Sequence, residues 1–306
     1  MINLAPIRYR KVMAEFGGPI SRLHTVFRSA GAGHGDCHHA AAYLASELFP
    51  PRYKRPRYSF DSPDGAGTHG SRQVACHMAI SEAIERWALH HLRAHGVTDC
   101  YGLGLDPSSN GFAAFPGLTS RPAREAARAE AIERHSLLSW WEGSIGHHFI
   151  QDPAPGVKAI RLDTTLGQSP VAVLWGVHRS LHYTYGFGIG RDIEEACRRA
   201  LIERQRCNAI IDHHLSGAKN ESIRDADIAR MEDTFERRIA HFSRPEGFRL
   251  FHERLKRQNH RKTEKAEIHF DGPVKGPWSK YATVWRTVIV PPTRRHLSDT
   301  VDYFFW

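Results

Sequence analysis

The sequence predicts an α+β fold of mixed sheets and helices, built from repeated units in which a glycine-rich loop leads into a helix. Three glycine-rich segments each precede a helix-forming stretch, at Gly65 to Gly70, Ser108 to Gly117 and Gly186 to Gly190. Runs rich in β-branched and aromatic residues lie at 157–177 and 281–290. Helix and strand signals therefore alternate along one chain without any internal low-complexity linker.

The helices that follow the glycine segments carry acidic residues at matching positions. The pentapeptide E-A-I-E-R occurs at 82–86 and again at 130–134, and a weaker copy, A-L-I-E-R-Q-R, begins at Ala200. Residues three or four apart share one face of a helix, so the carboxylates of a copy converge on one point. Glycines let a backbone approach phosphate closely, and Mg²⁺ takes carboxylate oxygens together with phosphates. We therefore predict one nucleotide-polyphosphate site, held through Mg²⁺ and shared by the three helices.

The predicted site has two groups of residues. The glutamates are the expected Mg²⁺ ligands or their supports: Glu82, Glu85, Glu130, Glu133 and Glu203. Three arginines are expected to contact phosphate or to hold the glutamates: Arg86, Arg134 and Arg206. A single E-x-x-E-R is usually a solvated helix face. Two identical copies, each behind a glycine segment, favour the site over that alternative.

The order of these motifs resembles the YcaO-like family, whose members use ATP to modify backbone amides of peptides. The resemblance covers roughly residues 59–290. It rests on S-E-A-I-E-R at 81–86, S-N-G-F-A-A followed by A-E-A-I-E-R at 109–134, and G-F-G-I-G with R-R-A-L-I-E at 186–203. It implies the YcaO-like fold over residues 59–306, with residues 1–58 as an N-terminal extension. It also implies ATP and Mg²⁺ as cofactors, bound by the residues named above and by Ser71, whose hydroxyl is expected to face phosphate in place of a lysine common in the family.

The resemblance further implies a reaction and its partners. A nucleophile adds to a backbone carbonyl, ATP phosphorylates the resulting oxyanion, and phosphate leaves. The expected product is an azoline in a ribosomally synthesised precursor peptide, with thioamide or amidine formation as the alternative. We recognise no domain that grasps a leader peptide, so a separate leader-binding partner protein is expected. A homodimer is compatible with the resemblance, and Arg224 is a weaker phosphate-contact candidate.

Several positions depart from the family pattern. Met78 stands where a serine usually lies four residues before the first glutamate, and a lysine common in the first glycine segment is absent near Thr68. His135 follows the second E-R, and Gln205 or Arg206 stands nearest to the glutamine expected after the third glutamate. The C-terminal tail also lacks a P-x-P-x-P pattern. These departures leave a second hypothesis open, a non-catalytic nucleotide-binding scaffold subunit.

Composition limits the classes of partner and compartment. The 306 residues carry a formal charge of +9, from 42 basic and 33 acidic residues, which favours anionic partners. No aromatic–basic motif accompanies the charge, so we do not expect nucleic-acid binding, and salt-sensitive DNA affinity would be the sign of that alternative. No apolar run approaches the roughly 20 residues that span a bilayer. We therefore expect a cytoplasmic protein without membrane contact.

One cluster near the N-terminus combines metal-ligand residue types. The segment G-A-G-H-G-D-C-H-H contains His34, Asp36, Cys37, His38 and His39. Structural zinc sites usually use two separated ligand pairs, so a glycine loop before a helix over 40–49 is the favoured interpretation. The five cysteines have no C-x-x-C spacing and indicate neither a disulfide framework nor a zinc finger.

The other elements follow from periodicity and turn signals. Trp140 and Trp141 are expected in the core, as is the aromatic tail D-Y-F-F-W. The expected strands are at 24–28 and 281–290, with a hairpin over 157–177. The expected helices are one that ends near Ala94 and others at 122–141, 193–211, 226–242 and 246–258.

Overall fold

The computed structural model forms two compact units, which are described separately. Unit 1 comprises Met1–Pro56, Ser62–Ala131 and Ile268–Ile289, and unit 2 comprises Arg57–Asp61, Ile132–Glu267 and Val290–Trp306. The expected boundary at residue 58 lies outside the residues that the structure describes. Those residues are 2–28, 37–53, 63–97, 100–102, 110–164, 166–179, 182–216, 222–257, 265–291, 298 and 300–304.

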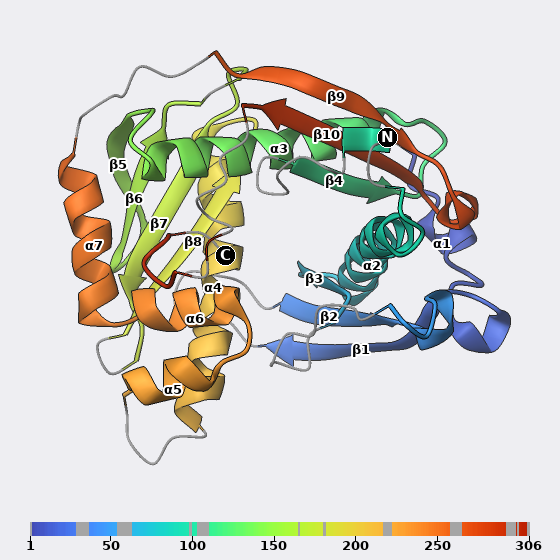
Figure 1. Cartoon of the computed structure of the whole chain (residues 1–306), viewed down its shortest axis with the longest axis horizontal. Helices are drawn as coiled ribbons and strands as arrows, with labels where there is room; N and C mark the ends of the chain where they lie inside the picture. Colours follow the sequence, from blue (N-terminus) through green and yellow to red (C-terminus); the bar gives the residue numbers. More distant parts are fainter. Residues whose placement is uncertain are drawn as a thin grey trace. The chain divides into compact units, whose positions relative to one another are not determined.

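Unit 1 contains two three-stranded antiparallel sheets (Figure 1). The helix α2 (Arg72–Ala94) packs on the first sheet through small residues such as Ala79 and Ala83, and Trp87 and Trp278 meet edge to face in the same core. A short helix, α1 (Ala5–Arg8), precedes the sheets. The first sheet has the order β1 (Ile20–Arg28), β2 (Cys37–Leu44), β3 (Gly65–His69), and the second the order β4 (Asn110–Phe115), β10 (Thr283–Val290), β9 (Glu267–Val274).

Unit 2 is built on a four-stranded antiparallel meander (Figure 1). Its strands are β5 (His147–Ala154), β6 (Val157–Leu162), β7 (Val171–Val177) and β8 (Tyr183–Ile189). The helix α4 packs on β7 and β8 through Ala196 and Ala200. The helices are α4 (Ile193–Ser216), α5 (Asp225–Arg230), α6 (Thr234–Phe242) and α7 (Pro245–Lys256).

The three glycine-rich segments form strands, not the expected loops. They are β3, β4 and β8, and each runs into one of the helices α2, α3 (Arg121–Trp141) and α4. A Cβ atom on Gly65, Gly111 or Gly186 would overlap the backbone of the following helix. The glycines therefore allow a helix backbone to lie directly on a strand, which a side chain would prevent.

The other expected elements are largely confirmed. The helix ends at Ala94 as expected, the hairpin over 157–177 is β6–β7, and its connection contains Gly167 at φ +75°. Trp140 and Phe304 are completely buried in one aromatic cluster of unit 2, which confirms the expected packing of the tail.

Two expectations about helices are wrong. Residues 37–44 form the strand β2, where a helix over 40–49 was expected, because they pair on both sides with β1 and β3. The helix expected over 226–242 is two helices, because Met231 is extended and Asp233 caps a new helix by accepting the N–H of Phe235.

Candidate functional site

The first glutamate of each E-x-x-E-R helix binds the strand that precedes it. Each of the three glycine strands is an edge strand of its sheet, and alternate N–H groups of an edge strand point away from the sheet. The Ala66 N–H in β3 donates to Glu82 Oε2 at 2.9 Å, and the Phe112 N–H in β4 donates to Glu130 Oε2 at 2.8 Å. The same position in the two copies therefore has the same structural role.

The second glutamate of each helix binds the next glycine strand along the chain. Glu85 of α2 accepts the Ala114 N–H of β4 at 2.7 Å. Glu133 of α3 accepts the Ile189 N–H of β8, also at 2.7 Å. The two glutamates of a copy thus connect one helix to two successive strands, and each leaves a second carboxylate oxygen to meet another group.

Electrostatic repulsion is concentrated at Glu85. Burial raises the pKa of its carboxyl well above the usual range, and the neighbouring carboxylates of Glu130 and Glu82 raise it further. The Ala114 N–H and Arg86 act in the opposite direction and do not outweigh these effects. Unit 1 therefore brings three predicted ligands together in an arrangement that an added positive charge would stabilise.

Arg86 and Arg134 follow the first glutamate of their copies by four residues, and Ser71 lies at the start of α2. Arg86 forms an ion pair with Glu82 at 3.1 Å, one helical turn away. Arg134 occupies the corresponding position after Glu130. Ser71 is the exposed N-cap residue of α2; its side chain makes no capping bond, and its N–H donates to His69 Nδ1. The hydroxyl therefore lies at the positive end of a 23-residue helix.

The glycine contacts place the third copy in exact structural register with the first two. Gly65 lies against Ala79 and Ala83, Gly111 against Ala127 and Ala131, and Gly186 against Ala200 and Arg204.

In each copy the first glutamate lies three residues after the first alanine that the glycine contacts, namely Ala79, Ala127 or Ala200. Glu203 therefore corresponds in position to Glu82 and Glu130. Arg206 then matches the second glutamate of each copy, Glu85 or Glu133, and Gln205 matches no glutamate. Arg206 donates to Glu203 at 2.6 Å, so the third copy contains an ion pair where the others contain two carboxylates.

The donor set fits a hard divalent cation in its chemistry. Mg²⁺ prefers oxygen ligands, and the two full copies supply four carboxylates. Within the described parts of the chain, no group of three or more His, Cys, Asp or Glu side chains is arranged to hold a metal ion. The strand N–H groups and Arg86 engage carboxylate oxygens that a bound metal would have to share. Binding would therefore require these side chains to turn, and the roles of the predicted ligands stay a prediction.

The described part of the histidine–cysteine segment contributes only short contacts at the end of β2. His34 and Asp36 lie outside the described residues. Cys37 Sγ lies 3.7 Å from His39 Nε2, and His39 Nδ1 lies 2.8 Å from the hydroxyl of Thr68 on the neighbouring strand. These contacts order the end of the first sheet.

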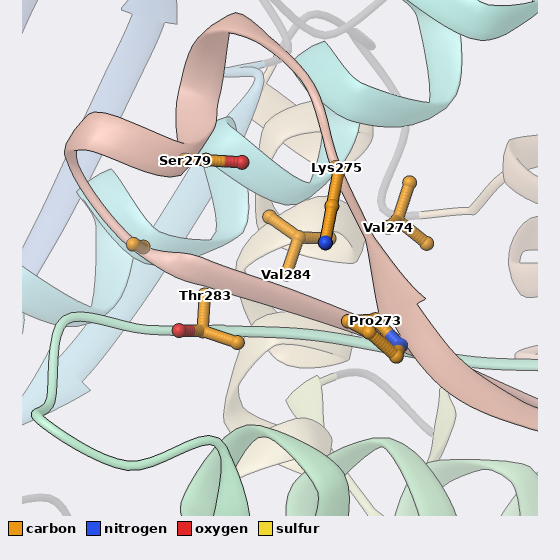
Figure 2. Close-up of a pocket in the computed structure, with 7 residues that line it drawn as sticks. Pro273, Val274, Lys275, Ser279, Thr283 and Val284 are labelled. Atoms are coloured by element: carbon orange, nitrogen blue, oxygen red, sulfur yellow. The ribbon is translucent and has the colours of Figure 1, made fainter.

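Two pockets lie outside the acidic helices. A cavity of about 220 Å³ in unit 1 lies between the end of β9, where Pro273 and Lys275 line it, and the start of β10, with Ser279 on the connection (Figure 2). A cavity of about 450 Å³ in unit 2 is lined by Arg224 and Arg244 among others. Arg224, the weaker phosphate-contact candidate, thus lines a pocket of unit 2, and it also forms an ion pair with Asp227.

Sequence reasoning missed the other groups that bind the free edge of β8. The Tyr183 N–H donates to the Ser243 carbonyl at 2.7 Å, and the Tyr185 N–H donates to the buried Cys207 thiol. Cys207 stands where the first two copies have Arg86 and Arg134. This difference between the copies was the signal in the sequence that another group could contact β8. The outward N–H groups of β8 are thus bound by three different residue types.

The fold is shared with solved structures, although no protein-family model and no curated protein matches the sequence. YcaO from Methanopyrus kandleri, bound with AMPPCP and Mg²⁺, has a TM-score of 0.54 and 14% identity, over 97% of this chain and 91% of that chain. A chain of the E. coli microcin synthetase McbBCD complex with pro-MccB17 bound has a TM-score of 0.51 and 12% identity, over 87% of each chain. The chain is thus structurally similar to YcaO proteins over nearly its full length, and the predicted α+β class is confirmed.

The described helices also bear on membrane contact. None of them combines the length and the apolar character that crossing a bilayer requires.

Proposed function

We propose that the chain binds ATP with Mg²⁺ on its acidic helices and uses it to activate backbone amides in a ribosomally synthesised precursor peptide. The observation that carries the proposal is the repeated E-x-x-E-R helix, in which matching glutamates bind matching edge strands. The shared fold supports it, because the similar YcaO structure from M. kandleri is bound with AMPPCP and Mg²⁺. The proposed cation ligands are Glu82, Glu85, Glu130 and Glu133, joined by Glu203.

Other residues of the chain have distinct tasks in this proposal. Arg86 and Arg134 follow the glutamates by one turn and would neutralise phosphate oxygens, which suit a guanidinium. The Ser71 hydroxyl would donate to phosphate at the start of α2, where helix N–H groups attract anions. When bound, the nucleotide would supply the phosphoryl group that activates an amide oxygen.

The peptide part of the proposal rests on the second structural relative. The microcin synthetase complex contains pro-MccB17 together with several protein chains. By analogy of fold, we propose a precursor-peptide substrate and a separate leader-binding partner for this chain. Cyclodehydration to an azoline is the proposed reaction, and thioamide or amidine formation is its alternative with the same phosphoryl chemistry.

The test uses glutamine variants, because they separate the two roles of each glutamate. Glutamine still accepts a strand N–H through its amide oxygen, whereas it loses the charge that a cation requires. Glu82→Gln and Glu130→Gln are expected to keep the thermal stability of the wild type and to weaken Mg-AMPPCP binding at least about tenfold in calorimetric titrations.

The matched control is Glu125→Gln. Glu125 lies on α3, is exposed, and forms an ion pair with Arg121, four residues earlier. This variant should bind the nucleotide as the wild type does. If Glu82→Gln and Glu130→Gln also bind normally, the nucleotide does not use the acidic helices and the proposal fails.

A scaffold subunit that binds nucleotide without turnover is the second candidate. Met78, at the expected serine position, is 43% exposed and offers no hydroxyl, and Arg206 replaces a glutamate. Phosphate release in the presence of peptide and partner would exclude this candidate. Normal Mg-ATP affinity with no release would favour it.

A further inference from the structure

The third helix carries an arginine at the position where the other two carry their second glutamate. In α2 and α3, the position three residues after the first glutamate is another glutamate, Glu85 or Glu133. In α4 it is Arg206, whose guanidinium donates to Glu203 at 2.6 Å. Each full copy therefore contains two glutamates and one arginine, whereas this turn of α4 contains one glutamate, Glu203, with Arg204 and Arg206.

The Glu203–Arg206 pair is accessible to ligands. The side chain of Glu203 is 40% exposed and that of Arg206 is 32% exposed. Ion pairs at such exposure are weak, because water solvates both charges well. An incoming ion can therefore replace either partner at low cost.

The surroundings of β8 show which ions would compete. Glu133 binds the Ile189 N–H of β8, and α4 packs on the same strand, where Gly186 lies against Ala200. A cation that used the carboxylates beside β8 would compete with Arg206 for Glu203. A phosphate group would compete with Glu203 for Arg206, and it offers a guanidinium more negative charge and more acceptor oxygens than one carboxylate does.

We propose that Arg206 is a positioning residue that withholds Glu203 from divalent cations until an anionic phosphate group draws the guanidinium away. Anion binding at Arg206 then frees Glu203, so phosphate and cation binding reinforce each other. Reciprocity requires the same coupling in both directions. This inference rests on the proposed nucleotide function. It adds that phosphate binding at Arg206 promotes cation binding at Glu203.

The test measures Mn²⁺ binding to the purified chain by electron paramagnetic resonance, without nucleotide. Arg206→Gln releases Glu203 permanently and is expected to bind Mn²⁺ about fivefold more tightly than the wild type, the factor that corresponds to a well-placed exposed ion pair. The double variant Glu203→Gln/Arg206→Gln should lose this gain. Arg206→Lys, which keeps the positive charge, should behave as the wild type does.

Inorganic phosphate provides a second readout. It should tighten Mn²⁺ binding to the wild type and leave the Arg206→Gln variant unaffected. Arg199→Gln is the matched control, since Arg199 pairs with Glu195 on the same helix at 2.8 Å and Glu195 keeps Arg191. Both of its Mn²⁺ titrations should match the wild type.

The inference is overturned if Arg206→Gln binds Mn²⁺ no more tightly than the wild type, or if phosphate tightens binding equally in both. Failure of the nucleotide proposal is detected separately, because it depends on Mg-AMPPCP titrations of Glu82→Gln and Glu130→Gln. Thermal unfolding of every variant checks that the fold is retained.

Discussion

The glutamates of the two full copies each accept a backbone N–H group from a glycine strand. Glu82 and Glu130 accept N–H groups from their own strands, and Glu85 and Glu133 accept them from the next strand. An edge N–H left without an acceptor in a half-buried position costs about 1–3 kcal/mol. An alanine variant would therefore mix a loss of stability with a loss of ligand binding, which is why the amide variants are informative.

Glu85 makes the stability of the protein depend on pH in a predictable direction. Its pKa in the folded protein is raised above the ordinary value of 4.5 by burial and by Glu130 and Glu82. Above pH 4.5 the unfolded chain ionises this group freely, whereas the folded protein resists its ionisation. The stability that Glu85 contributes is thus fully present below the unfolded pKa and is lost as pH rises toward the folded pKa.

Glu85→Gln should remove this dependence. Without divalent cations, the melting temperature of the variant relative to the wild type is expected to be higher at about pH 8 than at about pH 5. Glutamine keeps an acceptor for the Ala114 N–H, so the comparison isolates the charge. A difference in melting temperature that stays constant over this range would show that folding does not raise the pKa of Glu85.

At the scale of elements, a glycine strand and the helix that follows it form the repeated structural unit. Gly65, Gly111 and Gly186 lie against alanine-rich faces of α2, α3 and α4. This close approach brings the first glutamate of the helix within reach of the strand N–H in the two full copies. The packing of the unit and the position of its carboxylate therefore have one cause.

Gly111→Ala tests the packing of this unit. The new Cβ would overlap the Ala127 carbonyl oxygen, and we expect a loss of at least about 3 kcal/mol in the free energy of unfolding by urea. Gly96→Ala is the comparison, because Gly96 has φ +68° and open space around it. It should cost only about 1 kcal/mol. Similar losses in the two variants would contradict the close-packing account.

The helices could be predicted from sequence more reliably than the strands between them. The helix ending at Ala94 is strongly periodic, and its glutamates are visible as a repeat. Gly65 and Gly67 suggested a loop because glycine is depleted in strands, and their contacts with a distant helix face cannot be read locally. The alanine-rich run at 40–42 favours a helix by propensity, but pairing with two strands overrides it.

At the scale of the whole chain, the repeat singled out carboxylates that contact the glycine strands, but it did not show which N–H groups they accept. The contact between Glu133 and Ile189 joins residues 56 positions apart, and no local pattern encodes it. Helical phase already favours Arg206 over Gln205 from the sequence alone. The register of Gly186 against Ala200 adds that Arg206 corresponds in position to Glu85 and Glu133.

The central claim is that the acidic helices hold a divalent cation together with nucleotide. A crystal structure with AMPPCP and Mn²⁺, with manganese located by its anomalous scattering, tests it most directly. The account predicts manganese within about 2.2 Å of carboxylate oxygens from the E-x-x-E-R helices, including Glu82 or Glu130, and bound also to phosphate. Nucleotide bound elsewhere, with these glutamates still accepting only strand N–H groups and arginine, would contradict the account and leave the repeats as purely structural elements.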